Sequence, residues 1–145
     1  MAEKKPQTFA NHVRLDPLFH FFALPFFGLS VIGSIVHFIQ HPGPHSAWLF
    51  VALVAGTIIV LKVRLYALRV QDRVIRLEER LRLGSVLSEP LKSRIPELTE
   101  DQLIGLRFAP DAELPALVQR ALTEKLLRAD IKKSIQNWRP DYWRV

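Results

Sequence analysis

Residues 17–61 contain no Asp, Glu, Lys or Arg, and this uncharged stretch constrains the fold more than any other feature of the chain. It is 45 residues long, and a Pro-Gly-Pro segment at 42–44 interrupts it near its middle. A membrane-spanning helix needs about 20 predominantly apolar residues, so the stretch is long enough for two spans. The sequence therefore predicts an integral membrane protein rather than a soluble globular domain.

The two spans are predicted to form a transmembrane helical hairpin over residues 17–65. Asp16 followed by Pro17 favours a helix start, because Asp accepts hydrogen bonds from free backbone amides and Pro suits the first turn. The prolines at 42 and 44 cannot continue that helix, so a turn is predicted over residues 41–46. Ser46 is expected to cap the second span.

Small residues within the spans are expected to let the two hairpin helices approach closely. Two small-xxx-small pairs are present, one in each span: Ser30 with Ser34, and Ala52 with Gly56. We favour packing within the hairpin over a separate dimer face for these pairs. Pro25 lacks a backbone N–H and is expected to kink the first span.

The distribution of charge predicts that both termini are cytoplasmic. The connection over residues 41–47 has no Lys or Arg, whereas residues 62–83 carry a net charge of +4 out of a total of +6. Lys and Arg concentrate on the cytoplasmic side of membrane proteins. Residues 1–16 are therefore predicted to be a cytoplasmic N-terminal tail.

The second span is expected to continue as a juxtamembrane helix over residues 66–83. Its apolar residues recur at alternating spacings of four and three, which is a heptad pattern: Val63, Ala67, Val70, Val74, Leu77 and Leu81. In a parallel dimer with this register, Arg73 would face Glu78 of the partner. From the sequence alone we favour the alternative, in which these residues pack against the chain's own C-terminal helices.

Four arginines form a basic stripe on the same predicted helix: Arg69, Arg73, Arg76 and Arg80. They are candidate contacts for anionic lipid headgroups, although a topology signal alone would also account for them. A nucleic-acid partner is not expected, because residues 84–145 have a net charge of only +1.

Residues 84–145 are predicted to form a small cytoplasmic helical domain, which makes the fold class all-α. Thr99 and Gln102 form a capping box, Asp111 is expected to cap the next helix, and Asp130 begins a third. A segment of this size is marginal for an independent core, so we expect it to pack on the long helix, the membrane or another subunit. Three C-terminal aromatic residues are candidate contacts for a partner or the membrane interface: Trp138, Tyr142 and Trp143.

The chain has no pattern typical of catalysis or of metal or cofactor binding. It contains no cysteine, which excludes disulfides and thiol chemistry. His37, His41 and His45 are spaced by four, but the prolines between them interrupt the helix that would align them on one metal. We find no nucleophile–base pair or phosphate-binding loop, so no enzymatic activity is expected.

Three stretches resemble the recurring blocks of a family of small, uncharacterised bacterial two-span membrane proteins, a domain of unknown function. They are residues 7–12, 106–117 and 131–138. The resemblance spans nearly the whole chain and implies a bacterial inner-membrane setting, with two spans followed by a cytoplasmic helical tail. It implies no activity and no site residue.

The leading hypothesis is a non-enzymatic inner-membrane protein that acts through its cytoplasmic helices as an adaptor or accessory subunit. Its partner would be an unidentified protein or a homo-oligomer. One alternative is an oligomeric transport or channel component, although neither span carries a charged residue for an ion path. A second alternative is a membrane-tethered lipid or nucleic-acid sensor.

Overall fold

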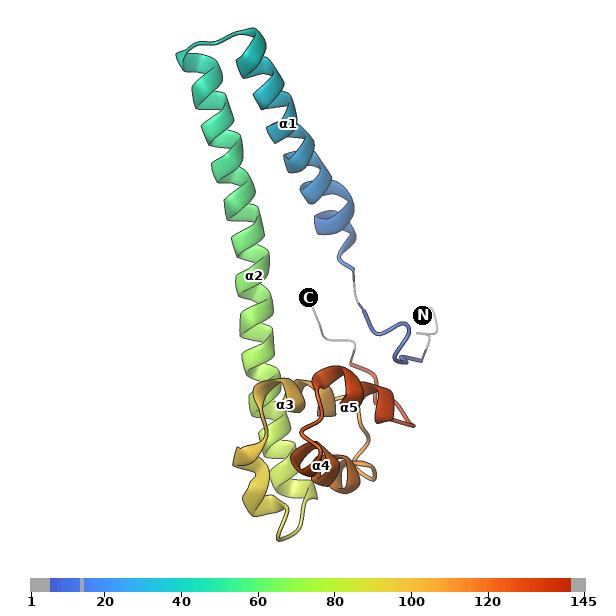
Figure 1. Ribbon diagram of the computed structural model, residues 1–145. Coiled ribbons are helices and arrows are strands. Elements are labelled where there is room, and N and C mark those ends of the chain that lie inside the picture. The colour runs from blue at the N-terminus through green and yellow to red at the C-terminus, as the bar shows by residue number, and fades with distance from the viewer. Residues whose placement is uncertain (1–5, 14, 142–145) are drawn as a thin grey trace. The chain divides into compact units, whose positions relative to one another are not determined.

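The computed structural model describes residues 6–13 and 15–141, which contain helices and no strand (Figure 1). The elements in chain order are a π-helix (Leu18–Ala23), α1 (Leu24–Gln40), α2 (Pro44–Val86), a 3-10 helix (Lys92–Glu97), α3 (Glu100–Leu106), α4 (Leu114–Thr123) and α5 (Arg128–Ser134). The chain divides into a hairpin unit, residues 15–69, and a domain unit, residues 6–13 with 70–141. Helix α2 contributes to both units.

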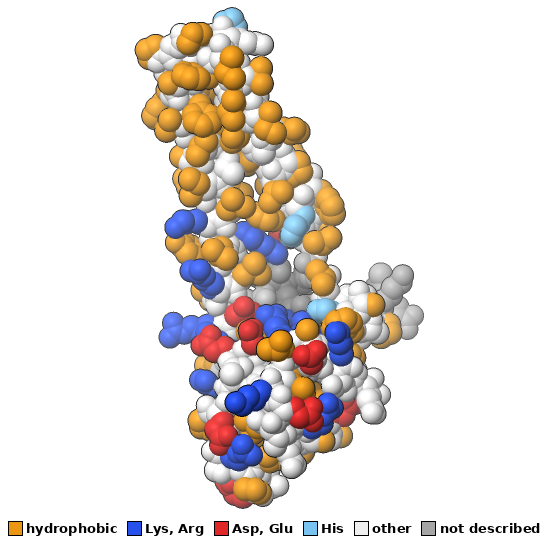
Figure 2. Space-filling view, viewed as in Figure 1, with side chains coloured by type: hydrophobic (Ala, Val, Ile, Leu, Met, Phe, Trp, Pro, Cys, Tyr) orange, Lys and Arg blue, Asp and Glu red, His pale blue; other side chains and the backbone are white. Residues whose placement is uncertain are grey.

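The hairpin unit contains two helices that are long and apolar enough to cross a membrane, Leu18–Gln40 and Pro44–Val86. Only 6% of the most apolar window of each helix is buried within the protein. Most of their large hydrophobic side chains are exposed, and Figure 2 shows these side chains covering α1 and the first half of α2. A helix that is apolar on all sides and largely exposed suits a lipid environment.

The first helix begins where the sequence predicts it to begin. The Asp16 carboxylate accepts hydrogen bonds from the backbone amides of Leu18 and Phe19, at 3.1 and 3.2 Å. These amides lie in the first turn and have no partner within the helix. The predicted role of Asp16 is confirmed.

A widened helical turn precedes Pro25, where the sequence predicts a kink. Pro25 lies in the first turn of α1, directly after the π-helix Leu18–Ala23. The Leu24 amide donates to the carbonyl of Phe19, five residues back instead of four. In a regular α-helix the proline ring would clash with the carbonyl four residues earlier, and a wider preceding turn relieves that clash.

The turn between the spans is shorter than predicted. Helix α2 begins at Pro44, because proline is well suited to the first helical position. Ser46 lies inside the first turn, where its hydroxyl donates to the carbonyls of His41 and Gly43 at 2.6 and 3.0 Å. The predicted capping role of Ser46 is therefore wrong, since its hydroxyl closes the turn from within the helix.

A glycine and a phenylalanine fit together where the two hairpin helices pack. A Cβ atom added at Gly56 would lie 3.0 Å from Cε1 of Phe27. Ser34 is buried, and its hydroxyl donates to the Val31 carbonyl at 2.7 Å. These contacts support the prediction that small residues serve packing within the hairpin.

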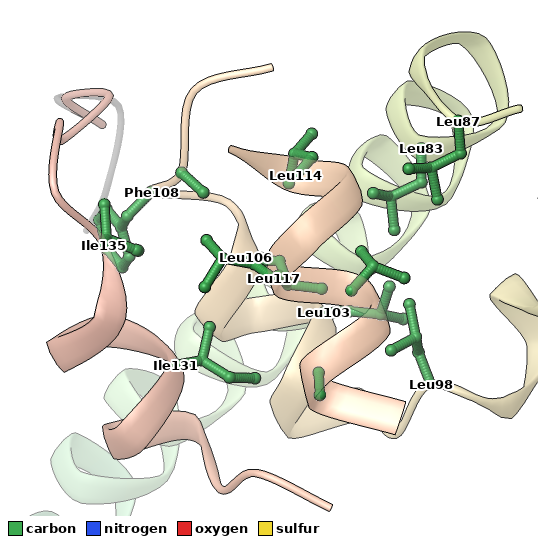
Figure 3. Packing of buried hydrophobic residues seen from close by; sticks show 13 residues of the cluster. Leu83, Leu87, Leu98, Leu103, Leu106, Phe108, Leu114, Leu117, Ile131 and Ile135 are labelled. Atoms are coloured by element: carbon green, nitrogen blue, oxygen red, sulfur yellow. The ribbon is translucent and has the colours of Figure 1, made fainter. Parts of the chain in front are cut away.

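The core of the domain unit is built on the C-terminal end of α2 and on the segments that follow (Figures 1 and 3). Leu83 of α2 and Leu87, which directly follows the helix, are buried in one cluster with α3, α4, α5 and their connections. The other large members of the cluster are Leu98, Leu103, Leu106, Phe108, Leu114, Leu117, Val118, Ile131 and Ile135. The sequence left three packing partners open for this small domain: the long helix, the membrane or another subunit. The structure shows packing on the long helix.

The capping box at the start of α3 is confirmed. Gln102 N donates to Thr99 Oγ1 at 3.2 Å, and Thr99 N donates to Gln102 Oε1 at 2.9 Å. The Gln102 side-chain amide also donates to the carbonyls of Ala121 and Leu126, at 2.8 and 3.1 Å. Gln102 thus completes the capping box of α3 and satisfies one carbonyl in α4 and one in the connection that follows α4.

Asp111 does not cap α4, and this prediction is wrong. Helix α4 begins three residues later, at Leu114, and the Asp111 carboxylate accepts from Arg82 Nε at 2.8 Å. Glu113, just before the helix, accepts from the backbone amides of Gln136 and Asn137 at 3.0 and 2.9 Å. Both acids therefore bind other segments of the domain unit instead of the α4 amides.

Candidate functional site

The segment of residues 7–12, here called the N-terminal segment, packs on the domain unit. The Gln7 side chain donates to the Asp141 carbonyl at 3.1 Å and accepts from the Asp141 amide at 2.9 Å. The His12 ring lies 5.8 Å from the Phe108 ring and 5.5 Å from the Trp138 ring, between centroids. This segment was predicted as a tail, yet it is part of the same compact unit as residues 70–141.

Lys132 and His12 form the polar centre of this contact. Lys132 is only 7% exposed, and its Nζ lies 2.9 Å from His12 Nε2. His12 Nδ1 lies 2.7 Å from the Phe9 carbonyl oxygen. We assign the neutral tautomer with the proton on Nδ1, because Nδ1–H then donates to Phe9 while Nε2 accepts from the Lys132 ammonium.

Two buried cations lie close to the Phe108 ring. The Arg107 guanidinium is 4.4 Å from the Phe108 ring centroid, and Lys132 Nζ is 5.1 Å from it. Arg107 is 6% exposed, and its Nε lies 3.4 Å from Asp141 Oδ2. Cations close to an aromatic face are stabilised by the ring quadrupole. The arrangement holds three distant parts of the sequence together and offers no nucleophile–base pair.

The three stretches singled out in the sequence, residues 7–12, 106–117 and 131–138, meet at this contact. Sequence reasoning missed this, because the contacting residues are far apart in the chain: His12 and Lys132 are separated by 120 positions. Periodicity in the sequence predicts local helices and strands, and it does not predict contacts between residues so far apart. The one available signal was the resemblance that all three stretches share.

A second polar cluster surrounds a buried acid of α2. Glu79 is 5% exposed, and its carboxylate lies 3.2 Å from Arg82 and 3.7 Å from Arg139. Desolvation raises the pKa of Glu79, and the two arginines offset part of that increase. Arg82 also donates to the Ala109 carbonyl at 2.7 Å. The sequence did not single out Arg82, although it joins α2 to the connection before α4.

The structure separates the four arginines of the predicted basic stripe. Arg76 forms an ion pair with Glu100 and donates to the Asp72 carbonyl, so it helps to hold the domain unit together. The remaining three are exposed: Arg69, Arg73 and Arg80. Of the aromatic candidates, Trp138 is half-buried against Phe108, and Tyr142 and Trp143 lie outside the described residues.

Four of the heptad residues of α2 lie in the domain unit and face away from its core, so the favoured packing prediction is wrong for these four. Val70 is 63% exposed, Val74 48%, Leu77 60% and Leu81 69%. We call these four residues the apolar stripe. The core side of α2 is formed instead by Ile75, Glu79 and Leu83, which are all buried. At about 100° per residue, these three residues lie about half a turn around the helix from the stripe.

The hairpin unit contains two apolar clefts. One, of about 190 Å³, is lined by residues of both helices that include Phe19, Phe27 and Val60. The other, of about 350 Å³, lies near the turn and includes Phe38 and Phe50. Linings of this kind suit lipid chains. Across residues 6–13 and 15–141, no three metal-ligating side chains form a group that could hold a metal ion.

The chain belongs to a family of unknown function (DUF6526), whose model matches residues 1–145. No curated protein and no solved structure matches the chain. Because the family match covers the whole chain, the hairpin unit and the domain unit belong to one family module.

Proposed function

We propose that the chain is a non-enzymatic two-span protein of a bacterial inner membrane, and that its domain unit serves as an adaptor or accessory subunit. The carrying observation is the double use of α2. Its first half contributes to the hairpin an exposed segment that carries no charge as far as Leu61, and its last turn contributes Leu83 to the domain core. One continuous helix therefore links the apolar hairpin to the core of the domain unit.

Contacts at both ends of the chain support a topology with both termini on one side of the membrane. The N-terminal segment packs on the same unit that contains residues 70–141. In the hairpin unit, Arg64 lies 3.7 Å from Asp16 and 5.5 Å from the Phe19 ring centroid. The positive charge after the second span favours the cytoplasm as the shared side.

Anionic lipid headgroups are proposed as a further contact of this region. Arg69 is exposed, and it follows Lys62 and Arg64 on the same helix. Each Lys or Arg near an anionic membrane surface contributes about 1 kcal/mol. Arg76 contributes less, because Glu100 already pairs with it.

Site-specific photo-crosslinking in the native membrane tests the adaptor role. A photoreactive amino acid would replace Gln119 on the exposed face of α4, and Ile39, which is 73% exposed in the hairpin, serves as the control position. We expect Gln119 to give a discrete adduct with another protein and Ile39 to give lipid adducts. Adducts of the same kind at both positions, or no protein adduct at Gln119 or at Ala116 beside it, would contradict an adaptor role.

A further inference from the structure

The apolar stripe is a cluster of large hydrophobic side chains on a part of α2 that belongs to the domain unit. Val70, Val74, Leu77 and Leu81 occupy successive turns of one helix face, and each is about half exposed or more. The domain core lies against the other face of α2, through Glu79 and Leu83. Contiguous apolar surface on a water-facing unit marks an interaction site.

The two flanks of the stripe carry opposite charges. Arg73 and Arg80 lie on one flank and Glu78 lies on the other, and all three side chains are exposed. None of the three forms an ion pair with the described part of the chain. A surface that is positive along one edge and negative along the other is complementary to a copy of itself in parallel orientation.

The heptad register turns this complementarity into a specific contact. With Val74 and Leu81 at position a and Val70 and Leu77 at position d, Arg73 occupies g and Glu78 occupies the e position that follows. In a parallel pair, the g residue of one helix faces that e residue of the other. Val at a with Leu at d, as in Val74 and Leu77, favours two strands over three or four.

We propose that a second copy of this chain covers the apolar stripe, as a parallel two-stranded coiled coil centred on residues 70–81 with Arg73 paired to the partner's Glu78. The inference rests on the proposed function, because insertion of both copies in the same direction makes their α2 helices parallel and sets them level. The contact covers fewer than two heptads, so it depends on the high effective concentration of chains in one bilayer.

The absence of cysteine from the sequence makes single-cysteine variants a direct test. Val74→Cys and Leu77→Cys place a thiol where the two-fold axis would pass, and Gln119→Cys on α4 is the exposed control. Oxidation of full-length protein in native membranes is expected to give several-fold more disulfide dimer at residues 74 and 77 than at residue 119. Equal yields at all three positions, or a Leu77→Cys adduct with a different protein instead, would overturn the proposal.

A charge exchange tests the flank contact in the Leu77→Cys background. Arg73→Glu alone and Glu78→Arg alone each place like charges opposite one another, and we expect each to lower the dimer yield several-fold. The double exchange restores opposite charges and is expected to recover most of that yield. A double variant no better than the worse single variant would overturn the assigned register.

Carbonate extraction of the same membranes separates the two proposals. Protein that stays in the membrane but gives no dimer at residues 74 and 77 overturns the second-copy inference and leaves the membrane anchor intact. Protein that is released by carbonate contradicts the proposed function itself.

Discussion

The hairpin unit and the domain unit use large apolar side chains in opposite ways. In the hairpin unit they point outward, and only 6% of each apolar window is buried. In the domain unit the same residue types are inside, where Leu83, Leu103 and Phe108 have no exposed surface. The apolar stripe is an exception, because it follows the hairpin pattern on a segment that belongs to the domain unit. The comparison shows that the same apolar residue types are exposed in one unit of this chain and buried in the other.

The largest expected effect separates two leucines of the same helix. Leu83→Ala leaves a cavity in the domain core and should lower the free energy of unfolding of the domain unit by about 2–5 kcal/mol. Leu81→Ala, at a residue that is 69% exposed, should change it by less than about 0.5 kcal/mol. Pulse proteolysis in urea, on detergent-solubilised protein diluted to favour monomers, measures both. Equal losses would contradict the placement of the stripe outside the core.

A glycine of the hairpin unit gives the next effect. Gly56→Leu would push a side chain into the Phe27 ring, whose Cε1 atom is already 3.0 Å from a Cβ position, and overpacking of this kind costs about 1–3 kcal/mol. Gly33→Leu is the matched control, because nothing lies within 4 Å of its Cβ position. Thermal unfolding in mild detergent should show a lower midpoint for the Gly56 variant. A larger loss in the Gly33 variant would show that the hairpin packs differently.

The contact of the N-terminal segment should contribute less to the free energy of unfolding than the packing at Leu83 or at Gly56. His12→Ala removes an acceptor from the buried Lys132 ammonium, and we expect a loss of about 1–2 kcal/mol because other groups also contact Lys132. Hydrogen exchange of residues 106–117 and 131–138 should become faster. Val13→Ala, at an exposed neighbouring residue, should leave the exchange unchanged. If His12→Ala has no effect on either stretch, the segment does not pack as described.

Two acids of the domain unit should give small and opposite pH dependences. Burial raises the pKa of Glu79, so its contribution to stability is complete below pH 4.5 and is lost as the pH rises through the folded-state value. At Glu113, desolvation is outweighed by hydrogen bonds from Gln136 and Asn137, and the pKa is lowered. Its contribution is present above pH 4.5 and is lost as the pH falls through the folded-state value.

Urea unfolding between pH 3 and pH 7 tests these directions with neutral variants. Glu79→Gln should remove the loss of stability that accompanies rising pH above 4.5. Glu113→Gln should remove the loss that accompanies falling pH below 4.5. Either variant with an unchanged pH profile would show that its carboxyl group has the same pKa in the folded and unfolded chain.

The sequence predicted those features of the fold that depend on neighbouring residues. Two helices long and apolar enough to span a membrane, the helix start at Asp16 and the capping box of Thr99 and Gln102 all follow from local composition and short-range hydrogen bonding. Ser46 and Asp111 were predicted as caps because their residue types are good acceptors. In the structure the Ser46 hydroxyl acts as a donor, to the His41 carbonyl. The Asp111 carboxylate accepts from Arg82 instead of from the helix amides.

The candidate site was less predictable because its parts are distant in sequence. A heptad pattern shows that Val70, Val74 and Leu77 share a face, but it does not show what covers that face. Burial against the domain core involves instead Leu83, in the last turn of α2, and Leu87, which directly follows the helix. The docking of Gln7 on Asp141 has no local signal, since neither residue type predicts the other.

The pairing of Gln7 with Asp141 also has a consequence for biosynthesis. The two residues are separated by 134 positions, so Gln7 leaves the ribosome on the order of ten seconds before Asp141 at ordinary rates of translation. During that interval both hairpin helices are made, while the surface that will hold the N-terminal segment is still incomplete. Closure of the domain unit is therefore a late event that follows synthesis of the spans. A nascent chain stalled before Asp141 would leave its first residues open to a protease or chaperone that the finished protein excludes.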